Sequence, residues 1–337
     1  MLTERTLGGF AKLADEVRAA ASKAWGPAHR PLLVLQLTHS GRFSKPDGTP
    51  GPMIVQHNPY LDPLHGLPPD YPPVSDGELE EVRDDLVAAA ELAAAAGFDG
   101  VDVKACHGYL VAETLAAHNR TESRYGGPFE NRSRLLLETL RLIRQEAPGL
   151  LVTSRISASD TVPFPFGFGM DPDAPETISL AETKALVSLL AQAGVGFLAV
   201  SLGIPYWKPH FGRPFDEPVP GGKLPEEHPL EGVARHLRIA SELQLSAPGT
   251  ALVGAGYSWL RTFGPGVGAA MVASGRTAVV GLGRGALAYP DFPKDLAARG
   301  RLNPRQVCTT CSLCSHLLRQ GRRTGCAVRD ARVYGVS

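Results

Sequence analysis

Four of the five cysteines lie close together near the C-terminal end of the chain, in a pattern typical of metal ligands. Their spacing is Cys308-x2-Cys311-x2-Cys314-x11-Cys326. In a cytoplasmic protein this spacing indicates a metal or iron–sulfur site rather than disulfides. Three thiolates on one tight loop, with a fourth from beyond a turn, favour a cluster, because structural zinc sites usually divide their ligands into two separated pairs. We therefore predict a [4Fe–4S] cluster on these cysteines, with zinc as the alternative.

A second group of reactive side chains follows the strand-like run Gly100–Ala105. Lys104, His107 and Tyr109 lie within six residues of one another, around the isolated Cys106, which we interpret as a buried packing residue. Catalytic groups gather at strand ends in barrel enzymes, which favours a chemical role. The alternative is that the lysine extends from the rim into solvent and the histidine caps a turn.

Cationic and glycine-rich positions follow the other strand-like runs. Arg155 lies near the end of the run Leu150–Ile156, where its side chain would point into a barrel mouth. The alternative is a purely structural role, in an ion pair inside the barrel. The last two runs are followed by Gly254-Ala-Gly256 and by Gly283-Arg284. Barrels often bind phosphate there, because glycines let backbone N–H groups approach an anion closely.

Composition places the chain among ordinary globular proteins. It has 337 residues, of which 43% are hydrophobic and 20% charged, and 34 basic residues balance 34 acidic ones. Because the formal net charge is zero, the chain has no overall positive charge to attract nucleic acid, which argues against nucleic acid as a partner. No apolar run reaches the ~20 residues that a membrane helix needs, and the start is unlike a signal peptide. The expected location is the cytoplasm.

Apolar strand-like runs alternate with amphipathic helical patterns over most of the chain. The helical pattern Gly77–Ala96 has the clearest signals, with Ser75 or Asp76 as the cap and Gly97 as the stop. The predicted strands are Pro31–Thr38, Gly100–Ala105, Leu150–Ile156, Gly196–Ser201, Ala251–Gly254 and Thr277–Gly281. The other predicted helices are near Phe10–Lys23, Asn131–Ala147, Leu180–Ala193, Leu230–Leu243 and Trp259–Ser274.

This alternation predicts an α/β fold with a parallel sheet, as a (β/α) barrel or an open doubly wound sheet. No GxGxxG follows the first strand, which argues against a dinucleotide-binding open sheet. Two long proline-rich loops, 40–74 and 201–229, follow strands, where barrel enzymes keep their chemistry. We therefore expect a TIM-type barrel. Only six of its eight strands are found, and the two missing ones belong at the front.

Two strings carry a specific family resemblance. They are Gly97-Phe-Asp-Gly-Val-Asp-Val-Lys-Ala-Cys-His-Gly-Tyr-Leu110 and Asn119-Arg-Thr-Glu-Ser-Arg-Tyr-Gly-Gly-Pro-Phe-Glu-Asn-Arg-Ser-Arg134. The chain resembles the old yellow enzyme family of FMN-dependent NADH:flavin oxidoreductases and ene-reductases. It is most similar to the iron–sulfur branch that includes 2,4-dienoyl-CoA reductase and trimethylamine dehydrogenase. Supporting motifs at 36–42, 155–157 and 281–291 extend the resemblance over nearly the whole chain.

The resemblance implies an FMN site. It assigns Arg155 to the N1 and O2 region of the flavin, where a fixed positive charge stabilises the reduced form. It assigns Gln36 a hydrogen bond to the flavin ring. The flavin phosphate would be held by Gly254, Gly256, Gly283 and Arg284. His39 and Arg42 could also face flavin or substrate.

The resemblance also implies catalytic roles. His107 and Lys104 would polarise the activating group of an alkene, and Tyr109 would protonate the α-carbon after hydride reaches the β-carbon. Lys104 departs from the family pattern, which has histidine there in old yellow enzyme itself, so the substrate class is in doubt. The stretch 125–134 is family-like but is interpreted as structural.

We expect residues 1–303 to form the FMN-binding barrel and 304–337 the iron–sulfur segment. The implied activity is an NAD(P)H-dependent ene-reductase acting on a small molecule of enone or dienoyl type. One alternative is an amine-type dehydrogenase that passes electrons through the cluster to a redox partner subunit. Another is a non-catalytic truncated barrel whose four cysteines bind a structural metal. A homo-oligomer is compatible with the sequence, which does not determine the assembly.

Overall fold

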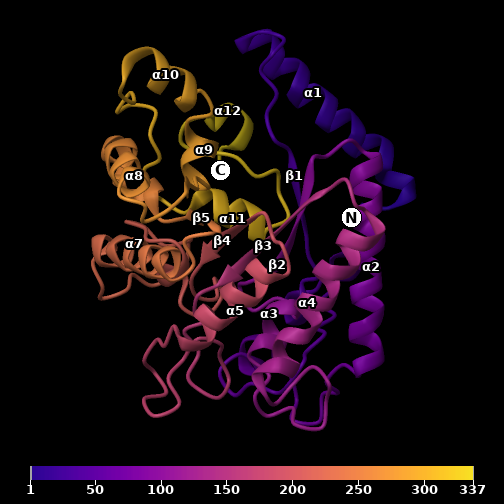
Figure 1. Cartoon of the computed structure of the whole chain (residues 1–337). Coiled ribbons are helices and arrows are strands. Elements are labelled where there is room, and N and C mark those ends of the chain that lie inside the picture. Colours follow the sequence, from indigo (N-terminus) through magenta and orange to yellow (C-terminus); the bar gives the residue numbers. More distant parts are fainter. Residues whose placement is uncertain (1, 337) are drawn as a thin grey trace. The chain divides into compact units, whose positions relative to one another are not determined.

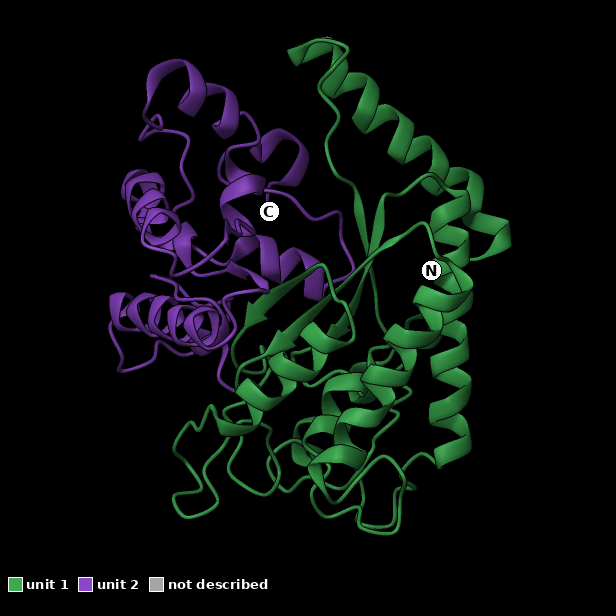
Figure 2. Cartoon of the chain, in the orientation of Figure 1, with its two compact units in different colours: residues 1–207 green, residues 208–337 purple. Residues whose placement is uncertain are grey.

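The computed structural model describes residues 2–336 and divides the chain into two compact units, Met1–Trp207 and Lys208–Ser337 (Figure 2). We call them unit 1 and unit 2. The division falls within the loop after the fourth strand. The boundary expected between residues 303 and 304 stays a prediction.

Unit 1 is built around four parallel strands joined by helices (Figure 1). Each strand pairs with the next along the chain, so β1 pairs with β2, β2 with β3 and β3 with β4. The strands are β1 (Val34–Leu37), β2 (Gly100–Ala105), β3 (Leu151–Ser157) and β4 (Phe197–Ser201). The helices are α1 (Leu7–Trp25), α2 (Asp76–Ala95), α3 (Leu110–Leu115), α4 (Phe129–Glu146) and α5 (Ala181–Gln192), with short 3-10 turns at Glu4–Thr6, Gly41–Phe43, Pro46–Gly48 and Asp62–His65.

Unit 2 continues the alternation with two parallel strands, β5 (Ala251–Gly254) and β6 (Val279–Val280). Its helices are α6 (Pro209–Gly212), α7 (Pro229–Ser246), α8 (Gly264–Ala273), α9 (Arg284–Ala288), α10 (Phe292–Arg299), α11 (Leu313–Arg319) and α12 (Ala331–Tyr334), and a 3-10 segment, η5, covers Tyr257–Phe263. All six predicted strands are present. The single helix expected near Trp259–Ser274 is instead η5 followed by α8, because the chain kinks at Arg261, where φ is 53°.

Helix α2 shows how local sequence fixes an element. Ser75 Oγ accepts a hydrogen bond from the backbone N–H of Glu78, whose carboxylate accepts from the N–H of Ser75, and this capping box begins the helix. Gly97, with a φ of 83°, ends it. The side chains that α2 buries recur three or four residues apart: Leu79, Val82, Leu86, Ala90 and Ala93.

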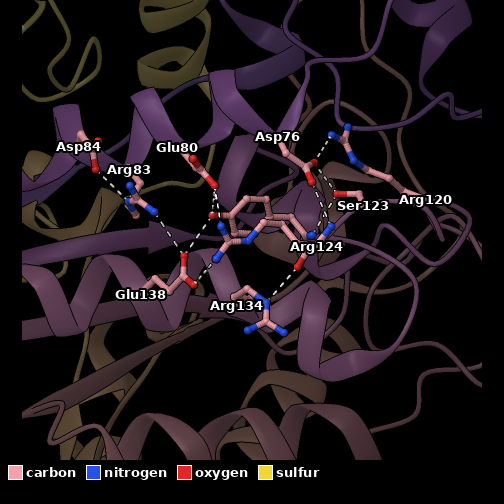
Figure 3. Close-up of polar contacts among 10 residues, drawn as sticks. Asp76, Glu80, Arg83, Asp84, Arg120, Ser123, Arg124, Arg134 and Glu138 are labelled. Carbon is pink, nitrogen blue, oxygen red and sulfur yellow. Dashed lines mark hydrogen bonds and ion pairs between the residues drawn. The ribbon is translucent and has the colours of Figure 1, made fainter.

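A polar network fastens the family-like stretch around residue 125 to α2 (Figure 3). The Asp76 carboxylate accepts from Arg120 at 2.7 Å, from the Ser123 hydroxyl at 2.5 Å and from the backbone N–H of Arg124 at 3.0 Å. The Arg124 guanidinium also donates to Glu138 of α4 at 3.0 Å. These contacts are between protein groups, in keeping with the structural interpretation of this stretch.

Arg42 is part of the core. Its guanidinium has no exposed surface and donates to Asp62 at 2.5 Å, to Glu113 at 2.5 Å and to the carbonyl oxygen of Gln56 at 3.0 Å. Burial makes each partner depend on the others, because a charge left alone here would be neither solvated nor paired. Arg42 therefore holds the loop after β1 against α3, and its guanidinium is not available to a ligand.

We predict that Arg42→Ala lowers the free energy of unfolding by about 3–5 kcal/mol, because it leaves Glu113 as an uncompensated buried charge. Arg30→Ala is the control, since the Arg30 side chain is 66% exposed where it pairs with Asp99 and such pairs contribute at most about 1 kcal/mol. Urea unfolding of both variants measures the difference. Equal, small losses would contradict a structural role for Arg42.

Candidate functional site

The carboxyl ends of β2 and β3 bring two positive charges together in unit 1. Lys104 lies directly opposite Arg155 in the parallel register. The Lys104 side chain is buried, at 8% exposure, and burial lowers its pKa to about 8, with a further contribution from Arg155. Neither residue forms an ion pair with a carboxylate within residues 2–336. The predicted catalytic lysine and the predicted flavin arginine are therefore neighbours in one cationic site.

His107 is held in place by a residue that the sequence analysis did not single out. Its Nε2 lies 2.7 Å from the hydroxyl of Ser201, the last residue of β4, and Arg155 donates to the same hydroxyl at 3.4 Å. His107 and Gly108 both have positive φ, 67° and 68°, and this turn redirects the chain after β2. Burial, then Arg155 and Lys104, hold the pKa of His107 well below its usual value, so the imidazole is neutral. The only sequence signal for Ser201 was its place at a strand end.

Tyr109 completes this group of three predicted catalytic residues. The Lys104 ammonium lies 3.3 Å from the centre of the Tyr109 ring. Burial raises the pKa of the phenol, and Tyr206 raises it further, so Tyr109 stays protonated and is a potential proton donor. Phe43 stacks on Tyr206, with ring centres 4.3 Å apart, and lies 5.8 Å from Tyr109. Unit 1 therefore places an ammonium, a neutral imidazole and a phenol at the end of one strand.

Gln36 lies on the same face of the sheet as Lys104 and Arg155, one layer of side chains nearer the start of the strands. It is opposite Asp102 in the register, and its amide nitrogen donates to the Asp102 carboxylate at 2.7 Å. Thr153 donates to the other carboxylate oxygen at 3.0 Å. Burial raises the pKa of Asp102. Gln36 is exposed, and its assignment to the flavin ring stays a prediction.

Of the predicted phosphate-binding residues, all in unit 2, Gly254 is the last residue of β5 and its backbone N–H donates to the Thr277 hydroxyl at 3.1 Å, whereas Gly256, Gly283 and Arg284 follow β5 and β6. Gly256 has a φ of 94°, and a Cβ there would lie 3.0 Å from the Cβ of His236, so only glycine suits the position. At Gly283, an added Cβ would meet nothing within 4 Å. Among the described residues, the backbone N–H groups of Gly256, Gly283 and Arg284 have no hydrogen-bond acceptor. Open N–H donors on glycine loops fit an anionic phosphate.

All four clustered cysteines line one recess in unit 2. Thr310 and Ser312, between the first three cysteines, have positive φ of 58° and 59°, which folds this segment into a tight loop. Backbone N–H groups donate to two of the sulfur atoms, from Thr310 to Cys308 at 3.3 Å and from Arg329 to Cys326 at 3.4 Å. Such N–H···S bonds suit ligating thiolates.

No three side chains within residues 2–336 are arranged to hold a single metal ion. A four-iron cluster separates its thiolates more widely than one ion does. The convergence of four sulfur atoms on one recess therefore fits the donor set of a [4Fe–4S] cluster, which stays a prediction.

The Arg284 side chain faces these cysteines. Its guanidinium lines the same recess and donates to the carbonyl oxygen of Pro214 at 2.8 Å. Its other guanidinium nitrogen, Nη1, has no hydrogen-bond partner among the described residues.

A second pocket of unit 2 has a different character. It has a volume of about 700 Å³ and its lining is mostly apolar, from η5, α8, β6, α9 and α10. Its charged lining residue, Arg261, pairs with Asp216. None of the three predicted catalytic side chains lines this pocket. We therefore do not assign the catalytic site to it.

Comparison with known proteins identifies the family. The model of the NADH:flavin oxidoreductase / NADH oxidase family matches residues 2–185, more than half of the chain. The chain belongs to this family. The resemblance to old yellow enzymes predicted from the sequence is confirmed. Along 313 residues, 92% of the chain, it is 28% identical to an NADH oxidase of Thermoanaerobacter brockii and covers 41% of that protein.

Solved structures confirm the barrel-type α/β fold. The 6-hydroxypseudooxynicotine amine oxidase of Pseudomonas geniculata N1 aligns over 99% of this chain and 44% of its own, with a TM-score of 0.71 and 20% identity. The old yellow enzyme homologue of Zymomonas mobilis aligns over 90% of this chain and 74% of its own, with a TM-score of 0.61 and 20% identity. The chain spans less than half the length of the NADH oxidase that it matches. That two strands are missing from the front stays a prediction.

For a member of an NADH:flavin oxidoreductase family, the observed groups suit a flavin. The guanidinium of Arg155, which forms no ion pair with a carboxylate within residues 2–336, matches the negative charge of a reduced flavin ring, and the open N–H groups after β5 and β6 match a phosphate. Within residues 2–336, no helix is long and apolar enough to span a membrane.

We predict that Arg329→Ala lowers the iron content of purified protein. The Arg329 guanidinium donates to the carbonyl oxygen of Val307 at 2.7 and 3.2 Å, which ties the turn at Cys326 to the residue before Cys308. Without this tie, the fourth thiolate is less well placed, and we expect iron per chain to fall at least twofold. The exposed Arg323, changed to alanine, is the control. Equal iron contents in the two variants would contradict the prediction.

Proposed function

We propose that this protein is an FMN-dependent ene-reductase that takes electrons from NAD(P)H and reduces an activated alkene of enone or dienoyl type. The observation that carries the proposal is the grouping of Lys104, His107 and Tyr109 at the end of β2. When bound, reduced FMN supplies the hydride. The protein residues bind the substrate, draw electron density from its double bond and deliver the proton.

His107 and Lys104 polarise the activating group of the substrate. His107 is neutral, and its ring is oriented by the hydroxyl of Ser201, so it can donate one hydrogen bond to a carbonyl oxygen. Lys104 adds a positive charge in a desolvated setting, where it stabilises the negative charge that develops on that oxygen. Arg155 contributes a second charge from the adjacent strand.

Tyr109 delivers the proton to the α-carbon. Its phenol is protonated at neutral pH, since burial raises its pKa. The Lys104 ammonium beside the ring favours the phenolate that forms during transfer, so it assists the acid as well as the activating group.

The four cysteines support a [4Fe–4S] cluster in unit 2 as a second redox group. The amine-dehydrogenase alternative remains a second candidate, supported by the similarity in fold to a protein named as an amine oxidase. Anaerobic mixing of oxidised protein with candidate amines separates the two. Bleaching of the flavin without NAD(P)H would favour amine oxidation.

Replacing Tyr109 tests the assignment of the acid. We expect Tyr109→Phe to slow alkene reduction by about 10²–10⁴-fold, the usual contribution of a general acid, and to leave flavin reduction by NAD(P)H unchanged. Tyr60→Phe, which removes a hydroxyl elsewhere in unit 1, is the matched control. Stopped-flow measurement of the two half-reactions provides both rates. Unchanged alkene turnover in Tyr109→Phe would refute the role.

The pH profile tests Lys104. Its pKa of about 8 means that the ammonium is charged below pH 8 and loses its proton above it. We therefore expect kcat/KM for the alkene to fall as pH rises through about 8. In Lys104→Met that step should disappear and the low-pH rate should drop, whereas Lys12→Met, at an exposed position, should behave as wild type. A step that persists in Lys104→Met would assign the titration to another group.

A further inference from the structure

Arg284 has no counter-charge bonded to it in its own unit. One guanidinium nitrogen, Nη2, donates to the carbonyl oxygen of Pro214 at 2.8 Å. The other, Nη1, is buried and has no hydrogen-bond partner among the described residues. The side chain lines the recess that the four cysteines share. A buried, incompletely bonded guanidinium at a set of sulfur ligands requires an explanation.

Arg213 brings a second positive charge to the same loop. Its Nη1 donates at 2.7 Å to the hydroxyl of Ser315, the residue after Cys314. Burial, together with the charges of Arg284 and Arg319, lowers the pKa of Arg213 to about 10. Like charges thus gather around the cysteine loop and repel one another.

The nearest carboxylate does not neutralise them. Asp216 acts on Arg284 only through space, and its oxygens accept from Trp259 at 2.7 Å, from Thr310 at 3.1 Å and from Arg261. Within the described residues, neither Arg213 nor Arg284 forms an ion pair with a carboxylate. Burying such charges is unfavourable unless an anion offsets them. Four thiolates that carry a cluster form such an anion.

We propose that Arg213 and Arg284 are the charges that set the reduction potential of the cluster on Cys308, Cys311, Cys314 and Cys326. This inference rests on the cluster assigned under the proposed function. Arg213 comes from the loop before α7, and Arg284 from the loop after β6.

The physical basis is the charge of the two redox states. One-electron reduction of a cluster on four thiolates adds one negative charge and no proton. A fixed positive charge beside the sulfur atoms therefore stabilises the reduced state more than the oxidised state and raises the potential. Removal of either guanidinium should make the cluster harder to reduce.

The test uses the full chain, purified without oxygen, as wild type, Arg213→Gln, Arg284→Gln and Arg284→Lys, with the exposed Arg323→Gln as control. Each protein is titrated with dithionite in the presence of mediators, and the reduced cluster is followed by electron paramagnetic resonance. Iron, sulfide and flavin contents are measured on the same samples. Glutamine removes the charge, whereas lysine keeps it.

We expect each glutamine variant at 213 or 284 to keep its iron and to lower the equilibrium constant for one-electron reduction about tenfold, a fall of about 59 mV. Arg284→Lys should recover most of this fall, and Arg323→Gln should match wild type. If Arg284→Gln loses its cluster, the inference is tested on Arg213→Gln and Arg284→Lys alone, with the same expected potentials for these two variants.

Unchanged potentials in iron-loaded glutamine variants would overturn the inference and leave the cluster in place. Loss of flavin with an unchanged potential would also overturn it, since Arg284 would then bind the flavin phosphate. Zinc in place of iron in the wild type would refute the cluster itself, and the inference with it.

Discussion

The parallel pairing of β2 with β3 places two cationic side chains side by side in a setting with little water. Lys104 and Arg155 lie at the same level, and no carboxylate forms an ion pair with either of them within residues 2–336. Such an arrangement has a free-energy cost, because the Lys104 ammonium is buried and the two charges repel each other. The arrangement becomes favourable when an electron-rich group occupies the site. A reduced flavin ring and the developing oxyanion of a polarised substrate, the two groups that the proposed function brings to unit 1, are both electron-rich.

The remaining contacts of unit 1 follow from that pairing. Burial, reinforced by the charges of Arg155 and Lys104, holds the pKa of His107 well below its usual value, so the imidazole is neutral and can serve as a hydrogen-bond donor. Ser201, one strand further, gives the ring a fixed orientation. Tyr109 lies over the lysine and keeps its proton. Burial is the main cause of the pKa shift of each of the three groups, and perturbed pKa values of this kind are common at functional sites.

Unit 2 uses the same electrostatic principle with a different ligand set. Asp216 and Glu217 bind the cysteine loop through Thr310 and Ser312. The backbone N–H of Asp216 donates to the Thr310 hydroxyl at 3.2 Å, and the Ser312 hydroxyl donates to the carbonyl oxygen of Glu217 at 2.7 Å. This tie fixes the loop in a conformation with two positive φ angles. The arginines that face the loop supply positive charge where thiolates supply negative charge. The expected cluster explains both the fixed conformation of the cysteine loop and the positive charge of the arginines that face it.

Much of this was predictable from the sequence, because the signals are local. The strands β2 and β5 have the predicted bounds, and the capping box of α2 begins where Ser75 predicted it. The family strings identified Lys104, His107 and Tyr109 as a group. Ser201 and Arg213 were not predictable, since their importance comes from partners 94 and 102 residues away in the chain. The direction of the Arg284 side chain was also hidden, because a Gly-Arg motif specifies the backbone and leaves the guanidinium to tertiary contacts.

The visible absorption spectrum of protein purified without oxygen tests the central claim, that this chain holds both a flavin and an iron–sulfur cluster. We predict resolved flavin bands over a broad iron–sulfur shoulder, with the flavin bands bleached by NAD(P)H. A colourless protein, after incubation with FMN, iron and sulfide under conditions that load a known relative, would contradict it. The assignments of Arg155 to a flavin and of the cysteines to a cluster would then fail together.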